Sequence, residues 1–182
     1  MLNLPFRRVL LIRLLLLTLA FIGFSAMAGK EDFKQQIMVE ATKQSGDGIE
    51  KSMYYRGDVK ISQGSLVIDA DEVDVIAKDG VGKEIFIARG TPASYEQTMD
   101  DGSHIKALAN EIKYTVANRT LTLVGNAELH QNSSRVQGES ILFDMENEQL
   151  NAEGNENTGD RVTTIFQPEK QDSNQEQSNA NP

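Results

Sequence analysis

Few residues of this chain have side chains of the types that catalyse reactions or bind metals. Their spacing in the sequence does not match catalytic or metal-binding motifs. His104 and His130 lie in polar stretches in which no second plausible metal ligand is near in the sequence. The acidic run "DADEVD" at 69–74 lacks the central glycine and the ligand order of a calcium-binding loop. No serine stands in a G-x-S-x-G motif, no glycine-rich phosphate loop is present, and the chain has no cysteine. We therefore predict no catalytic residue, no metal site and no cofactor.

The first 28 residues have the pattern of an export signal. Arginines precede an apolar run over 14–24, and "AMA" at 26–28 supplies the small residues that a signal peptidase recognises. We predict a cleavable Sec signal peptide over 1–28, cut between Ala28 and Gly29. The alternative is a retained N-terminal anchor, but the apolar run is shorter than the about 20 residues that a membrane span needs.

Charge and composition limit the possible partners. The chain has a formal net charge of −9, and some of its basic residues belong to the predicted signal, so the remainder is more acidic still. Nucleic acid is disfavoured as a partner because phosphate binding needs a basic surface. The end of the chain, "QPEKQDSNQEQSNANP" at 167–182, has no Leu, Ile, Val or aromatic residue, and we expect a disordered polar tail.

Between these ends, over 29–166, apolar and polar residues alternate. Ile112, Tyr114 and Val116 share one face of such a segment, and Lys113 lies on the other. A period of two is typical of strands with one buried face, and no segment after the signal has the periodicity of an amphipathic helix. The pattern predicts a single all-β domain of many short antiparallel strands.

A short pattern recurs four times along the predicted domain. A small residue stands two positions after an apolar one, and a glycine follows it 16 or 20 residues later; the small residues are Ala41, Ala70, Ala109 and Gly138, and the glycines are Gly57, Gly90, Gly125 and Gly154. This repeat favours a stack of similar units, with the glycines at turns between short strands, over a closed barrel. A stack also leaves an edge strand with unpaired backbone groups at each end.

Four blocks of sequence carry a resemblance to a known family: "QGSLVIDADEVDV", "GKEIFIARGTPASYEQ", "LTLVGNAELHQ" and "RVTTIFQP". In this order they resemble the OstA-like family of periplasmic lipopolysaccharide-transport proteins, over roughly residues 35–168. The cleavable signal argues against the membrane-anchored relative LptC. The length of the chain argues against the outer-membrane barrel protein LptD.

The resemblance implies a repetitive antiparallel β-jelly roll, in which two twisted sheets face each other around an apolar groove with open ends. It implies a periplasmic protein that binds the lipid A acyl chains of lipopolysaccharide. It further implies self-association end to end, and contact with LptC at the inner membrane and LptD at the outer membrane.

Inward-facing apolar residues are the candidates for lining such a groove. They are Ile37, Val39, Tyr95, Ile112, Tyr114, Val116, Leu121, Leu123 and Phe143. For each of them the alternative is ordinary core packing, since every half-buried strand has an apolar face. For the whole chain the alternatives to a lipid carrier are a structural or adhesive β-repeat protein of the cell envelope and, more weakly, a hydrolase with an unrecognised site.

Overall fold

The computed structural model describes residues 32–167, and within them the regular secondary structure is almost entirely β. The strands are β1 (Met38–Glu40), β2 (Lys43–Asp47), β3 (Ser52–Gln63), β4 (Leu66–Ile76), β5 (Ile85–Thr98), β6 (His104–Thr115), β7 (Thr120–Gln131), β8 (Ser134–Asp144), β9 (Gln149–Glu153) and β10 (Thr163–Phe166). Two short 3-10 helices, η2 (Asp32–Lys34) and η3 (Val116–Asn118), complete it, and neither could cross a membrane. The predicted signal at 1–28, and all of the predicted tail except Gln167, lie outside the described residues.

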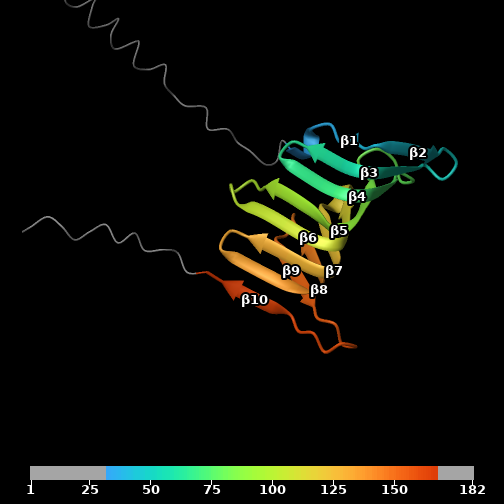
Figure 1. Cartoon of the computed structure of the whole chain (residues 1–182). Coiled ribbons are helices and arrows are strands. Elements are labelled where there is room, and N and C mark those ends of the chain that lie inside the picture. Colours follow the sequence, from blue (N-terminus) through green and yellow to red (C-terminus); the bar gives the residue numbers. More distant parts are fainter. Residues whose placement is uncertain (1–31, 168–182) are drawn as a thin grey trace, which may run out of the picture.

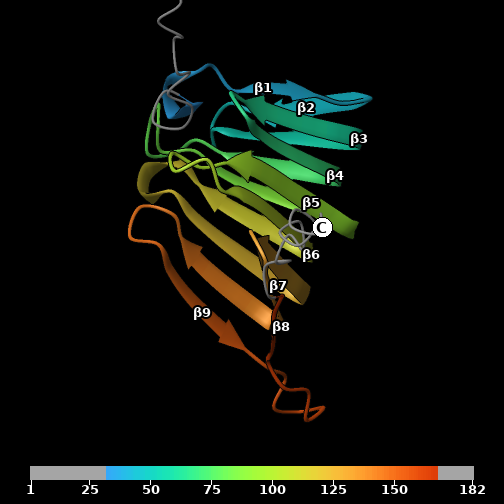
Figure 2. The same cartoon turned by 90° about the vertical axis from the view of Figure 1, so that its left-hand side faces the viewer.

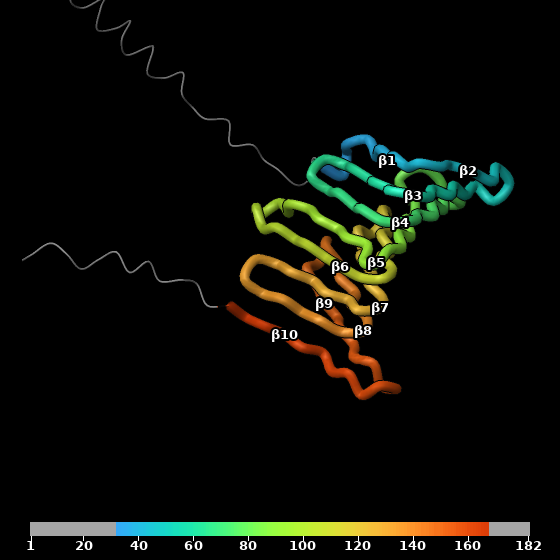
Figure 3. The backbone as a smooth tube through the Cα atoms, in the orientation of Figure 1, coloured from blue at the N-terminus to red at the C-terminus, as the bar shows by residue number. Residues whose placement is uncertain are grey.

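The strands form one antiparallel meander, which confirms the predicted fold class (Figure 1). We call each level of the meander a rung: β1 with β2, then β3 to β8 singly, then β9 with β10. Figure 2 shows the stack from β1 and β2 at one end to β9 at the other, and Figure 3 traces the chain through it from blue to red. The meander therefore has eight rungs, an even number.

The central strands are long and bent, which corrects the prediction of many short strands. Strands β3 to β8 have 11 to 14 residues each, and the register of each pairing shifts near the middle of the strands. Three of the four repeated glycines, Gly57, Gly90 and Gly125, lie at these shifts and not at turns, and Gly57 and Gly125 have φ of 80° and 76°. Gly154 lies in the connection between β9 and β10. A positive φ lets the backbone bulge and change direction without ending the strand.

The bends divide the ladder into two half-sheets. Half-sheet A contains β1, β10 and the parts of β3 to β8 that lie on their side of the bends, and half-sheet B contains β2, β9 and the other parts. The ring centroids of Tyr95 in half-sheet A and Tyr114 in half-sheet B are 6.2 Å apart. The two half-sheets therefore face each other, as a jelly roll requires.

The first and last rungs are edges of different construction. In the first rung only Ala41 and Thr42 separate β1 from β2, whereas in the last rung residues 154–162 separate β9 from β10. Within the described residues the strands of the first rung pair only with β3, and those of the last rung only with β8. Each edge thus presents backbone N–H and C=O groups that no described strand uses.

Candidate functional site

The interior between the half-sheets is where the structure places all nine predicted lining residues. Tyr95, Ile112, Tyr114, Leu121, Leu123 and Phe143 are at most 2% exposed, and Ile37, Val39 and Val116 are partly buried against them. Alternate residues of each strand turn inward, so both half-sheets contribute to one apolar cluster. The structure thus brings the nine together, while their contact with a ligand stays a prediction.

Two buried glutamines in this interior were missed by the sequence analysis. Gln63 and Gln97 are 4% and 1% exposed, and they lie two residues after the buried Ile61 and Tyr95. The same period of two that selected the apolar residues places both glutamines on the inner face. Their residue type, which is usually exposed in proteins, is the reason they were passed over.

Two tyrosine hydroxyl groups lie inside the apolar interior with different surroundings. The Tyr95 hydroxyl donates to Oε1 of Gln97 and lies 3.2 Å from Sδ of Met145. The Tyr114 hydroxyl has no hydrogen-bond partner among the described residues. Burial raises the pKa of Tyr114 to about 12, although the charge of Arg119 acts in the opposite direction, and burial also raises the pKa of Tyr95 well above its ordinary value. Both hydroxyls are therefore uncharged at neutral pH.

Opposite the bends, the hairpin turns of the two half-sheets come together along a line that we call the seam. The turns of half-sheet A are stacked at the left of Figure 1. A cleft of about 400 Å³ lies in the seam, lined by Phe33, Gln97, Thr98, Met99, Asp100 and Asp101 on one side and by Arg119, Met145, Glu146 and Glu148 on the other. No strand pairing between described residues crosses the seam, so side chains alone close the interior there.

The segment before the first strand, residues 32–37, lies at the seam, and we call it the strap. Asp32 accepts hydrogen bonds from the backbone N–H of Ser65, at 2.9 Å, and from the Ser65 hydroxyl. The adjacent Gly64 leaves room for this contact, since a Cβ there would lie 2.3 Å from the Asp32 carboxylate. The strap is thus attached to the β3–β4 turn of half-sheet A.

Further contacts fix the strap on both of its sides. Nε2 of Gln63 donates to the carbonyl oxygens of Phe33 and Gln35, at 3.2 and 3.1 Å. The guanidinium carbon of Arg119, in the β6–β7 turn of half-sheet B, lies 4.2 Å from the centroid of the Phe33 ring. This cation–π contact joins the strap to the opposite half-sheet.

The outer face near the bends carries a row of ion pairs instead of a site. Arg56 pairs with Glu72 and Asp74, and Arg89 pairs with Asp74 and Glu111, at 2.8 to 3.4 Å. Partial burial acts to raise the pKa of Asp74, but hydrogen bonds from the two arginines outweigh it and hold this pKa below its ordinary value. Part of the acidic run at 69–74 therefore links strands β3 to β6.

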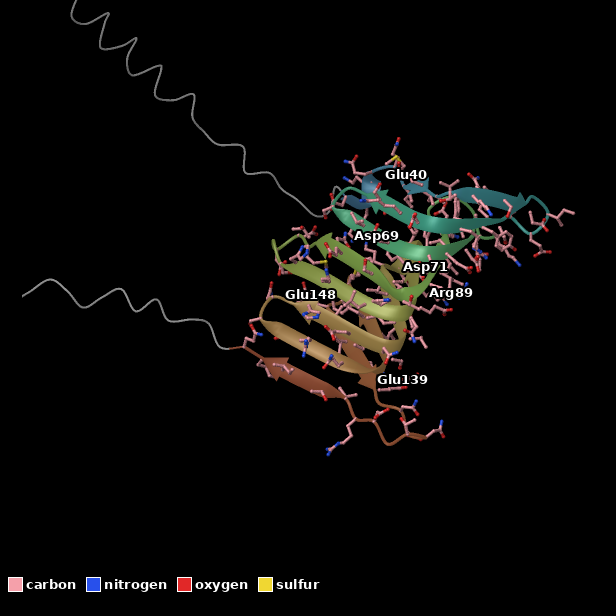
Figure 4. All side chains as sticks on the ribbon, in the orientation of Figure 1. Glu40, Asp69, Asp71, Arg89, Glu139 and Glu148 are labelled. Carbon is pink, nitrogen blue, oxygen red and sulfur yellow. The ribbon has the colours of Figure 1, made fainter. Side chains whose placement is uncertain are left out.

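The remaining carboxylates and the histidines do not gather into a centre. Figure 4 shows Glu40, Asp71 and Glu139 at separate levels of the stack, and these residues belong to β1, β4 and β8. His104 is exposed, and His130 contacts the Glu128 carboxylate on the outer face. No group of three possible metal-binding side chains occurs within residues 32–167. The interior and its seam are therefore the candidate site.

Comparison with known proteins relates this architecture to a family. Residues 38–149 match the family model described as "LptA/(LptD N-terminal domain) LPS transport protein". The lipopolysaccharide export system protein LptA of Haemophilus influenzae is 37% identical over 157 residues, which cover 85% of this chain and 90% of that protein. LptA of Escherichia coli K12 is 33% identical over 151 residues, which cover 82% of this chain and 80% of the relative.

A solved structure has the same fold. It is the crystal structure of LptH, described as the LptA homologous periplasmic component of the lipopolysaccharide transport device of Pseudomonas aeruginosa. The two structures align with a TM-score of 0.68 and 29% sequence identity, over 76% of this chain and 99% of that one.

Proposed function

Because this chain belongs to the family of lipopolysaccharide transport proteins that comprises LptA and the N-terminal domain of LptD, we propose that it shelters lipopolysaccharide acyl chains in its interior. It is a carrier that passes the glycolipid from the inner-membrane transport complex to the outer-membrane complex for outer-membrane assembly. The family is one of transport proteins and not of enzymes. A purely structural or adhesive role is not favoured.

The observation that supports this function within the molecule is the continuous apolar interior. It extends from Val59 in the second rung to Met145 at the end of β8, and both half-sheets contribute to it. Each CH₂ group transferred from water to such surroundings contributes about 0.8 kcal/mol, so a multiply acylated lipid gains much by entering. An acidic carrier cannot hold an anionic glycolipid mainly by charge, and the apolar contacts must dominate.

The side chains of the interior are packed against one another, so an acyl chain can enter only where the half-sheets separate. At the bends the backbone joins the half-sheets in every central rung. At the seam only side chains join them. Access from the seam side is therefore part of the proposal, with the bends as the hinge.

End-to-end association is the second part of the proposal, and the even number of rungs supports it. The first rung runs from half-sheet A to half-sheet B, and the last rung runs from half-sheet B to half-sheet A. The first rung of a second copy, placed beside the last rung, would therefore be antiparallel to it with like half-sheets adjacent. This placement would continue the existing hydrogen-bond pattern and join the two interiors.

We propose that the ends of such a bridge engage LptC at the inner membrane and LptD at the outer membrane, with the protein itself in the periplasm. Exposed apolar side chains favour contacts at the last rung: Leu150, Val162, Ile165 and Phe166. Apolar residues exposed together at an edge are typical of interaction surfaces.

Photo-crosslinking from neighbouring residues tests the carrier function. A photoreactive amino acid at Ile112 points into the interior, whereas the same amino acid at Lys113 points outward from the same strand. We expect lipopolysaccharide to crosslink to position 112 and not to position 113. Crosslinking at 113 alone, or at neither position while the protein is folded, would contradict the proposed function.

A further inference from the structure

In addition to the apolar packing of the interior, two specific side-chain contacts cross the seam close to one another. One is the contact of the Tyr95 hydroxyl in half-sheet A with the Met145 sulfur in half-sheet B, at 3.2 Å. The other is the contact of Phe33 in the strap with Arg119 in half-sheet B. The ion pairs of Arg56, Lys78, Arg89, Lys106, His130 and Arg135 do not cross the seam. Beyond the apolar packing of the interior, the described contacts that hold the seam itself are therefore few and weak.

On the side of half-sheet B the two contacts are mechanically linked. The backbone N–H of Met145 donates to the carbonyl oxygen of Arg119 at 3.1 Å, so the β6–β7 and β8–β9 turns are joined at these residues. Arg119 has φ of 50°, a left-handed conformation that ends the turn after η3. A displacement of Arg119 therefore pulls on Met145.

A similar link exists on the side of half-sheet A. The Ser65 hydroxyl, which donates to Asp32 of the strap, also accepts from the backbone N–H of Thr98 at 3.1 Å. Thr98 adjoins Gln97, the acceptor for the Tyr95 hydroxyl. Through Ser65 and Thr98, the strap and Tyr95 are thus both connected to the β3–β4 and β5–β6 turns.

From these contacts we propose that the strap is a latch: Phe33 against Arg119 keeps the seam closed, and its release admits an acyl chain. The inference rests on the proposed function. The strap is bound to half-sheet A by several hydrogen bonds and to half-sheet B by a cation–π contact. When the half-sheets separate, the weaker cation–π contact with half-sheet B breaks first. The strap therefore stays on half-sheet A while half-sheet B moves away.

The strength of the contact between Phe33 and Arg119 suits a gate that a lipid can open. A cation–π contact at a partly exposed site changes an equilibrium by a factor of about 2 to 5. Arg119 has no carboxylate within ion-pair distance among the described residues, unlike Arg56, Arg89 and Arg135. Its contact with Phe33 is therefore not reinforced by a salt bridge.

A reversible crosslink across the latch tests the proposal. The chain contains no cysteine, so Phe33→Cys with Arg119→Cys introduces the only two thiols, which a short reductively cleavable bis-maleimide can join. The matched control is Asp32→Cys with Ser65→Cys, which ties the strap to its own half-sheet. We expect the crosslink between positions 33 and 119 to slow uptake of fluorescent lipopolysaccharide at least tenfold, with recovery on cleavage. The control crosslink should change uptake by less than twofold.

A second probe separates failure of the latch from failure of the carrier function. N-phenyl-1-naphthylamine fluoresces in apolar surroundings and reports opening of the interior without lipopolysaccharide. Dye uptake that falls on crosslinking 33 to 119, with no lipopolysaccharide bound by any form, would support the latch and refute the carrier. Equal uptake of both probes before and after that crosslink would refute the latch.

Single substitutions without a crosslink give an independent check. Arg119→Gln removes the cation, and we expect it to accelerate lipopolysaccharide uptake by about two- to fivefold. Lys113→Gln makes the same change of charge on the outer face and should leave uptake unchanged. Slower uptake by Arg119→Gln would mean that Arg119 grips the ligand and would overturn the latch.

Discussion

Two buried tyrosines show how one hydroxyl group can stabilise a fold and another can destabilise it. The Tyr95 hydroxyl satisfies Gln97, whereas the Tyr114 hydroxyl, 1% exposed, has no partner among the described residues. A buried polar group without a hydrogen bond costs about 1–3 kcal/mol, and a satisfied one contributes about 1 kcal/mol. The two side chains are close neighbours, so the comparison is well matched.

We expect Tyr114→Phe to raise the free energy of unfolding by about 1 kcal/mol, because it removes an unsatisfied group. We expect Tyr95→Phe to lower it by about 1–3 kcal/mol, because it leaves the buried Gln97 without its donor. Urea unfolding followed by circular dichroism measures both. Changes of the same sign in the two variants would show that the hydroxyl environments are not as described.

The ion pairs of Asp74 predict a pH dependence of stability. Because the pKa of Asp74 is lower in the folded chain than in the unfolded chain, its stabilising effect is present above the unfolded value and is lost as the pH falls through the folded one. Asp74→Asn should lower the free energy of unfolding by about 1 kcal/mol at pH 7, the size expected of two partly exposed pairs. The difference from the parent protein should diminish in acid, as the pH falls through the lowered folded pKa of Asp74. A difference independent of pH would contradict the assignment.

At the scale of the strand, the bends are the features that turn a flat ladder into two facing half-sheets. Gly125 has φ of 76°, and a Cβ at that position would lie 2.7 Å from Nδ2 of Asn110 in the neighbouring strand. Gly48, in the β2–β3 turn, has no atom within 4 Å of such a Cβ and no positive φ. A comparison of substitutions at Gly125 and Gly48 therefore distinguishes the need for glycine at a bend from the general effect of replacing a glycine.

We expect Gly125→Ala to lower the free energy of unfolding by about 1–2 kcal/mol, since a left-handed conformation is unfavourable for a residue with a Cβ. Gly48→Ala should change it by less than about 0.5 kcal/mol. Thermal and urea unfolding of the two variants check this. An equal loss in both would show that the bend does not require glycine.

The periodicity of the sequence was enough to predict an all-β chain, the inner faces of its strands and the burial of the nine apolar candidates, but not the length of the strands or the two buried glutamines. Alternation identified Ile112 and Tyr114 correctly because the side chains of a strand point to opposite sides in turn. It could not distinguish a bend from a turn at Gly57, because a positive φ serves both, and only the pairing partners on either side decide between them. The contact of Phe33 with Arg119 joins residues far apart in the chain, so no local pattern announces it.

At the scale of the whole molecule, the two edges determine how copies can join. Phe166 in β10 is 75% exposed at the last rung, and Val81 in the β4–β5 loop is fully exposed but belongs to neither edge rung. Both are apolar residues on the surface, and only Phe166 lies where a second copy would add its first rung. A charge at the edge of a sheet opposes strand addition.

We expect Phe166→Lys to weaken self-association about tenfold or more, since burying a phenylalanine contributes about 1.5–3 kcal/mol. Val81→Lys should leave self-association unchanged. Sedimentation velocity over a range of protein concentrations measures both variants. Equal weakening by the two substitutions would show that net charge, and not the edge, controls association.

The two ends of the stack are unequal as docking partners. The two strands of the first rung follow each other closely, whereas a longer segment separates the two strands of the last rung. With only Ala41 and Thr42 between β1 and β2, the angle between the two halves of the first edge is set by the backbone. With 154–162 between β9 and β10, the two halves of the last edge can adjust to a neighbour separately. The first edge of the stack is thus a rigid docking surface, and the last edge is an adjustable one. An adjustable edge tolerates partners whose sheets differ slightly in curvature. The last edge can therefore accept either a second copy of this chain or a distantly related protein.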